Sequence, residues 1–225
     1  MPGAPVLLVH GLAASAASTW REAGWLDLLA DAGRTPIAPD LPGHGATPLP
    51  PPGEEIDLAA FLLDQIPDGS DPVAAIGFSL GARTVLLAAA AQPERFERLV
   101  VAGVGASLFR RDDSMLEVAD ALDAGDSSQP VARYFLDHSA RSGTDPKALA
   151  RLLREHRPEV TAEHYAKLMM PVLVVIGSED FAGPGDPLVE ALPNAELVTL
   201  RGVDHFSTPK NFGFLDAALE FLGAV

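Results

Sequence analysis

The chain has 225 residues, of which 48% are hydrophobic, a composition that supports one domain with a sizeable core and excludes a disordered chain. It contains no cysteine, which excludes disulfide bonds, thiolate metal sites and a cysteine nucleophile. The formal net charge of −15 disfavours nucleic acids and anionic membrane surfaces as partners.

No targeting or membrane segment is recognisable in the sequence. The apolar run at 6–9 follows no charged region and is too short for the hydrophobic part of a signal peptide. The transmembrane-like stretch at 73–91 is interrupted by Gly77, Ser79, Gly81 and Arg83, so we interpret it as a strand, a turn and a helix. We therefore expect a soluble, cytoplasmic protein, and its oligomeric state, monomer or homodimer, stays open.

Short runs rich in valine and isoleucine alternate with helical patterns along the chain, which predicts βαβ units and a mostly parallel sheet. A helix is expected from Thr19, or a neighbouring residue, to Gly33, and acidic residues favour another from Glu54 to Ile66. The predicted strands cover 6–9, 35–39, 73–77, 98–102, 172–176 and 196–200, and the remaining helices of the alternation cover 80–91 and 212–222.

One segment, 104–170, is richer in charge and has helical periodicity without a convincing strand. Its helices are expected at 115–122, 131–136 and 146–156. We interpret it as a small helical cap inserted into an α/β core that consists of residues 1–103 and 171–225.

The sequence from Gly77 to Gly81 matches Gly-x-Ser-x-Gly between a predicted buried strand and a predicted helix. A serine on so sharp a turn has strained backbone angles, and only very small residues fit two positions before and after it. The N-terminus of the following helix directs its N–H groups toward the serine, where negative charge develops during acyl transfer. This motif predicts that Ser79 is a nucleophile.

An acid and a histidine follow Ser79 in the order Ser, Asp, His, each just beyond the end of a predicted strand. The carboxyl ends of parallel strands meet at one edge of a sheet, where ligands bind. We predict that His205 is the general base and that Asp180 orients it, with Glu179 and Asp204 as the competing carboxylates.

With these residues the chain resembles the α/β-hydrolase superfamily over nearly its whole length, and in particular short-chain carboxylesterases and related hydrolases. The pair His10-Gly11 after the first strand is similar to the family's oxyanion-loop motif. The resemblance implies that the backbone N–H groups of Leu12 and Leu80 form an oxyanion hole. The turn at 40–45 is also similar to the family's, and there we interpret His44 as a turn residue.

We expect a carboxylic ester hydrolase that works through an acyl-enzyme, acts on small-molecule esters with short acyl chains, and needs neither a cofactor nor a metal. Candidate pocket residues are aromatic or aliphatic: Phe78, Leu108, Phe109, Met115, Phe135, Phe181 and Phe206.

Four alternatives remain. Carbon–carbon bond hydrolysis or peracid formation would use the same three side chains, and a non-catalytic binding protein could reuse the fold. A lyase is the other alternative, since the segment 77–83 is similar to the turn around the catalytic serine of the menaquinone-pathway synthase that eliminates pyruvate. The cap arginines of that enzyme meet substrate carboxylates, a role open here to Arg110, Arg111, Arg133 and Arg141.

Overall fold

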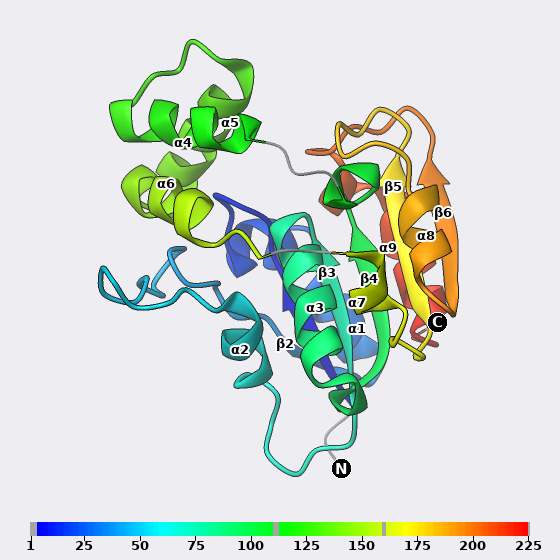
Figure 1. Cartoon of the computed structure of the whole chain (residues 1–225). Coiled ribbons are helices and arrows are strands. Elements are labelled where there is room, and N and C mark those ends of the chain that lie inside the picture. Colours follow the sequence, from blue (N-terminus) through cyan, green and yellow to red (C-terminus); the bar gives the residue numbers. More distant parts are fainter. Residues whose placement is uncertain (1–3, 110–112, 159–160, 225) are drawn as a thin grey trace.

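The computed structural model describes residues 4–109, 113–158 and 161–224. Within these ranges one sheet of six strands has the order β2-β1-β3-β4-β5-β6, with every neighbouring pair parallel (Figure 1). The strands are β1 (Pro5–Val9), β2 (Thr35–Ile37), β3 (Val73–Phe78), β4 (Phe96–Ala102), β5 (Val172–Gly177) and β6 (Ala195–Leu200). No helix in these ranges is long and apolar enough to span a bilayer.

The sheet is covered on both faces, which explains the continuous apolar runs of its central strands. In β1, Leu7 and Val9 pack with α2 (Leu58–Leu63), α3 (Leu80–Ala91) and α8 (Asp186–Ala191) on one face. Val6 and Leu8 pack with α1 (Trp25–Asp31) and α9 (Phe212–Phe221) on the other face. The predicted α/β fold with a mostly parallel sheet is confirmed.

Two helix predictions near the N-terminus need correction. The helix expected from Thr19 to Gly33 is divided into a short π-helix, η1 (Ala17–Arg21), and α1, because Gly24 between them has a left-handed φ of 81°. The helix expected from Glu54 begins only at Leu58, where the side chain of Asp57 accepts a hydrogen bond from the Ala60 N–H.

Short helical segments were not predicted, because three to six residues are too few to show a helical period. They are α8, α7 (Ala162–Tyr165), η2 (Pro93–Arg95), η3 (Ala106–Phe109) and η4 (Thr208–Lys210).

The predicted helical cap is present between β4 and β5. Its helices α4 (Ser114–Ala124), α5 (Pro130–Ser142) and α6 (Pro146–Glu155) pack around Val118, Phe135 and Leu149 (Figure 1). Ala13, from the loop that follows β1, belongs to the same cluster, so the cap contacts the carboxyl edge of the sheet. Leu108 and Tyr165, near the two ends of the insertion, pack with the sheet instead.

Candidate active site

Ser79 lies on a strained turn between β3 and α3. Its backbone angles are φ 55° and ψ −115°, and among the described non-glycine residues only Ala13 shares a positive φ. The flanking glycines are required by contact: a Cβ on Gly77 would lie 2.6 Å from the Ala82 Cα, and one on Gly81 would lie 2.1 Å from the Val9 carbonyl oxygen. The fold therefore maintains a backbone conformation that costs about 1–3 kcal/mol, and it holds the Ser79 hydroxyl at the carboxyl edge of the sheet.

A hydrogen-bonded chain joins the three polar side chains that the sequence singled out. His205 Nε2 lies 2.9 Å from Ser79 Oγ, and His205 Nδ1 lies 2.9 and 3.0 Å from the two carboxylate oxygens of Asp180. Asp180 Oδ1 also accepts a hydrogen bond of 2.8 Å from the Ala182 N–H. Both Asp180 and His205 are buried, so this chain is shielded from water.

The two competing carboxylates do not contact the His205 ring. Glu179 is exposed, and the pKa of Asp204 is lowered by hydrogen bonds from the side chain and then from the backbone N–H of Ser207. Asp180 is the carboxylate that the fold places beside the imidazole.

The two backbone N–H groups expected to bind an oxyanion flank the serine. Leu12 lines the same cavity as Ser79, and Leu80 is the first residue of α3. In the described part of the chain neither N–H donates a hydrogen bond, so both are available to a negatively charged oxygen.

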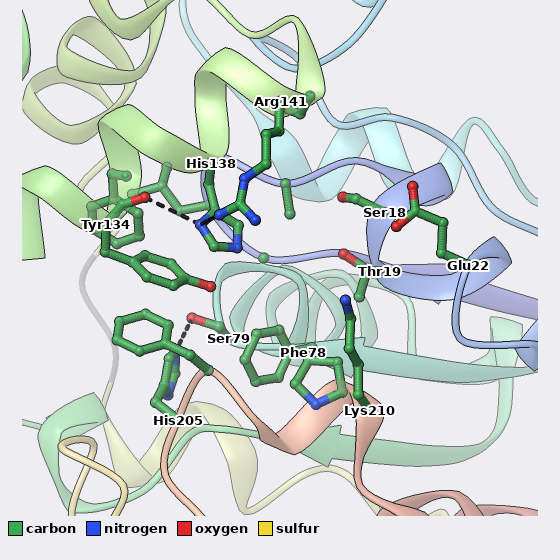
Figure 2. A pocket seen from close by; sticks show the side chains of 17 residues that line it. Ser18, Thr19, Glu22, Phe78, Ser79, Tyr134, His138, Arg141, His205 and Lys210 are labelled. Carbon is green, nitrogen blue, oxygen red and sulfur yellow. Dashed lines mark hydrogen bonds between the residues drawn. The ribbon is translucent and has the colours of Figure 1, made fainter.

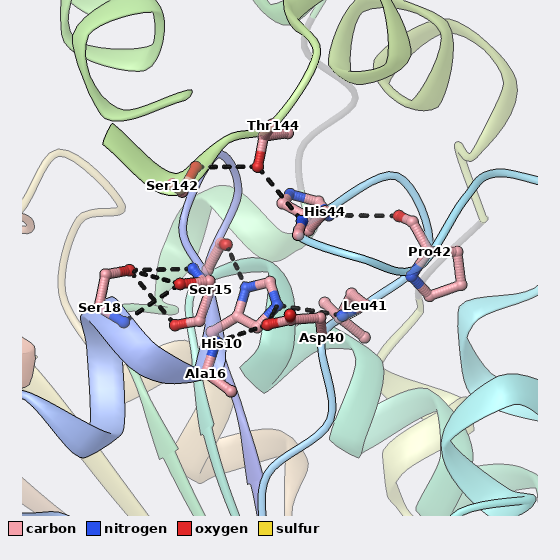
Figure 3. Close-up of polar contacts among 12 residues, drawn as sticks. His10, Ser15, Ala16, Ser18, Asp40, Leu41, Pro42, His44, Ser142 and Thr144 are labelled. Atoms are coloured by element: carbon pink, nitrogen blue, oxygen red, sulfur yellow. Dashed lines mark hydrogen bonds and ion pairs between the residues drawn. The ribbon is translucent and has the colours of Figure 1, made fainter. Parts of the chain in front are cut away.

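Two buried histidines hold the loop that carries Leu12 (Figure 3). His10 Nε2 accepts a hydrogen bond of 3.0 Å from the Leu41 N–H, and its Nδ1 lies 2.8 Å from the Gly11 carbonyl oxygen. His44 Nε2 accepts a hydrogen bond of 3.0 Å from the N–H of Ala13, the strained residue after Leu12. Burial lowers the pKa of His10 to about 4 and that of His44 to about 3, so both rings are neutral at pH 7. His44 lies in the turn as predicted, but its side chain supports the neighbouring loop.

The C-terminal end of α5 is tied to that same loop (Figure 3). Ser142 Oγ donates a hydrogen bond of 3.1 Å to the Ala13 carbonyl oxygen and lies 2.8 Å from Thr144 Oγ1. The cap and the loop that carries Leu12 are therefore directly connected.

A cavity of about 180 Å³ opens above Ser79 and is shared by the core and the cap (Figure 2). Phe78, Phe135 and Phe206 line it, as predicted. Polar and charged side chains form a comparable share of the cavity lining. They are Tyr134, His138 and Arg141 from α5, Lys210 from η4, and Glu22 after η1. At about 30 Å³ per water molecule, the volume equals roughly six waters, which suits a small ligand.

Four predicted pocket residues do not line this cavity, and the pocket prediction is corrected accordingly. Leu108 and Phe109 pack with the core beneath the sheet edge, where the Phe109 ring lies 6.2 Å from Tyr165. Met115 packs within the cap, and Phe181 is 60% exposed with its ring centroid 4.2 Å from that of His205.

Sequence reasoning missed Tyr134 and His138 as cavity residues and considered Arg141 only as an arginine of a lyase-like cap, and all three share one face of α5. Tyr134, His138 and Arg141 have the spacing i, i+4 and i+7, which places them on one side of a helix. The Tyr134 ring stacks on Phe206 with 3.5 Å between centroids and on His138 with 3.8 Å. Helical spacing was the available signal, but a polar face of this kind usually faces solvent.

The six-stranded parallel sheet, the cap and the serine on a strand–helix turn together define an α/β-hydrolase fold. The sequence model described as "Alpha/beta hydrolase family" matches residues 6–220, and the chain belongs to that family. No curated protein sequence matches the chain significantly.

Solved structures share the fold at low sequence identity. A bromoperoxidase from Bacillus anthracis is 24% identical with a TM-score of 0.78, and the match covers 98% of this chain and 92% of that one. An esterase from Exiguobacterium antarcticum is 18% identical with a TM-score of 0.78, at the same coverage of 98% and 92%. A marine microorganism esterase is 19% identical with a TM-score of 0.72, covering 98% and 96%. At these identities the similarity is evidence of the fold.

Proposed function

We propose that this α/β hydrolase cleaves small carboxylic esters through an acyl-enzyme formed on Ser79. The observation that carries the proposal is the hydrogen-bonded chain from Asp180 through His205 to Ser79, on a strained turn that opens into a cavity. Esterases among the structures with this fold are consistent with it.

The reaction follows from the positions of the three side chains. His205 Nε2 takes the Ser79 proton while Oγ bonds to the ester carbonyl carbon, and the N–H groups of Leu12 and Leu80 bind the resulting oxyanion. Collapse of this intermediate breaks the bond to the alcohol, which leaves with the proton from His205. A water molecule then gives a proton to His205 and adds to the acyl carbonyl. Collapse of this second intermediate breaks the bond to Ser79 Oγ, which takes the proton back from His205, and the acid is released.

The role assigned to Asp180 is electrostatic and orientational. Its carboxylate accepts the Nδ1–H of His205, which leaves the Nε2 lone pair directed toward Ser79 Oγ. It also stabilises the imidazolium that forms when the serine proton is transferred.

The size of the cavity supports short acyl chains. Each methylene group that fits contributes about 0.8 kcal/mol, but a volume of about 180 Å³ fills after a few carbon atoms. We expect kcat/KM to rise over the first acyl carbons and then to fall, and long-chain lipids to be poor substrates.

An organophosphonate tests the nucleophile directly. It is expected to label the protein once, on the peptide that contains Ser79, and Ser79→Ala is expected to abolish both labelling and ester turnover, with a loss of roughly 10⁴–10⁶-fold in kcat. Labelling at another residue, or a Ser79→Ala protein that keeps more than about a tenth of the activity, would overturn the proposal.

The alternative activities share these residues and differ in substrate. A panel of esters and lactones, together with substrates for carbon–carbon cleavage, peracid formation and pyruvate elimination, separates them from ester hydrolysis. Of the four arginines considered for the lyase, Arg141 lines the cavity and Arg133 binds the Ser127 carbonyl oxygen away from it, while Arg110 and Arg111 lie outside the described residues.

A further inference from the structure

The mouth of the cavity carries two positive charges, although the chain as a whole has a net charge of −15. Arg141, in the last turn of α5, and Lys210, in η4 shortly after His205, both line the cavity and are both exposed. Figure 2 shows them on two different sides of the space around Ser79, Arg141 from above and Lys210 from below. Among the described residues, Glu22 is the one acidic side chain that lines the same cavity.

Within the part of the chain that the structure describes, neither cation has an acidic partner. In the described ranges no carboxylate oxygen lies within 4.0 Å of Arg141 or Lys210, so Glu22 pairs with neither. By contrast, Arg151 and Arg154 on the neighbouring helix α6 both bind carboxylates. Two arginines of α6 are therefore paired with acids, whereas Arg141 at the cavity is paired with none among the described residues.

Neutral groups orient Arg141. Its Nη2 lies 3.0 Å from His138 Nδ1, and its Nε donates a hydrogen bond of 3.2 Å to the Asp137 carbonyl oxygen. His138 Nδ1 also lies 3.2 Å from the Tyr134 carbonyl oxygen, so this nitrogen lies between a cationic donor and a carbonyl acceptor. The pKa of His138 is lowered by burial and then by the charge of Arg141, so the ring is neutral at pH 7.

A continuous wall of rings links this cation to the nucleophile. The Phe206 ring lies 5.4 Å from His205, Tyr134 stacks on Phe206 at 3.5 Å, and His138 stacks on Tyr134 at 3.8 Å, all between centroids. A ligand whose carbonyl carbon is at Ser79 therefore meets Arg141 along the same wall.

We propose that Arg141 and Lys210 form a subsite for a carboxylate on the substrate, so that the preferred substrates are short esters carrying one carboxylate group. This inference rests on the proposed ester hydrolysis at Ser79. A guanidinium presents paired N–H donors that match a carboxylate. The small cavity and the acidic chain disfavour larger polyanions.

Matched esters test the subsite with the carboxylate on either side of the ester bond. Monomethyl glutarate and methyl glutaramate differ only in a carboxylate or amide on the acyl part, and 4-acetoxybutanoate and 4-acetoxybutanamide differ in the same way on the alcohol part. We expect kcat/KM, measured by acid titration, to favour the carboxylate in at least one pair by about ten-fold. The preferred pair shows which part of the substrate reaches the cations.

Charge removal should weaken this preference. Arg141→Gln and Lys210→Gln should each lower the carboxylate-to-amide ratio by roughly three- to ten-fold, and added salt should lower it in the wild type. Arg133→Gln is the matched control, because Arg133 lies on the same helix, is exposed and does not line the cavity. It should leave the ratio unchanged.

Failure of the subsite can be told apart from failure of the proposed function. If the esters are hydrolysed with ratios near one that neither substitution changes, the subsite is refuted and ester hydrolysis stands. If no ester is hydrolysed, calorimetric binding of the same four compounds to the Ser79→Ala protein tests the subsite alone. Carboxylate-dependent binding that Arg141→Gln weakens supports it, and equal binding of acid and amide overturns it.

Discussion

The two buried histidines that hold the loop carrying Leu12 should make the protein lose stability in mild acid. His10 and His44 are neutral in the folded state, with pKa values lowered to about 4 and about 3 by burial, whereas an unfolded chain binds protons at a pKa of about 6.5. The unfolded state therefore binds more protons below pH 6.5. By linkage, stability falls as the pH falls through that value toward the folded-state values, and it is fully present at higher pH.

The size of the effect follows from the width of that pH window. One unit of pKa difference corresponds to 1.36 kcal/mol, and pH 5.0 lies about 1.5 units below the unfolded-state pKa. Each of His10 and His44 should therefore cost about 2 kcal/mol of unfolding free energy between pH 7.5 and pH 5.0, or about 4 kcal/mol together. Burial also lowers the pKa of His138 and of His156, which adds to the loss in the same direction.

Urea unfolding at pH 7.5, 6.5, 5.8 and 5.0 measures this loss, and a His44→Gln variant isolates one contribution. At pH 7.5 the variant should be less stable by about 1–3 kcal/mol, because the buried Ala13 N–H loses its imidazole acceptor. Toward pH 5.0 the gap should close by about 2 kcal/mol, since glutamine does not titrate. Parallel curves for the two proteins, or a wild type whose stability changes by less than about 1 kcal/mol, would refute the reasoning.

Three further substitutions test the active-site geometry. Asp180→Asn should lower kcat by about 10⁴-fold on the best ester, measured in steady-state assays. Glu179→Gln, at an exposed position, should change kcat by less than about two-fold. If Glu179→Gln had the larger effect, Glu179 would be the acid that orients His205. Ser79→Gly should have a free energy of unfolding about 1 kcal/mol higher than Ser79→Ala, and so a higher urea midpoint, because glycine relieves the positive φ. Equal midpoints would exclude strain at this turn. Gly81→Ala should lower stability by about 3 kcal/mol, visible as a lower melting temperature, because the new Cβ meets a backbone oxygen at 2.1 Å; an unchanged melting temperature would contradict the packing of the turn.

The sheet and the turn at Ser79 could be predicted because their causes are local in sequence. All residues of β3 and β5 are buried, so each strand appears as an unbroken apolar run, and the glycines around Ser79 are imposed by contacts at fixed offsets. The placement of Asp180 and His205 followed from strand ends alone, since a parallel sheet collects them at one edge.

The cavity could not be predicted in the same way, because its walls depend on how α5 is seated over the sheet. Leu108 and Met115 are apolar and close in sequence to the edge of the core, yet both pack into hydrophobic clusters rather than over Ser79. The sequence offered Arg141 as one of four candidate cap arginines, and only the tertiary arrangement shows that it lines the cavity above Ser79 while Arg133 does not. Likewise, the hydrogen bond from Ala13 to His44 joins residues 31 positions apart, beyond the reach of any local pattern.

The cationic mouth of the cavity also affects how the reaction ends. Cleavage of an ester that carries its carboxylate on the acyl side produces a dicarboxylate, which has one more negative charge than the substrate. Arg141 and Lys210 attract that product more strongly than the ester that entered. Product departure, rather than bond cleavage, would then limit turnover at high substrate concentration, and accumulated acid would compete with fresh ester. Beyond the mouth, the strongly acidic chain repels the same anion once it leaves.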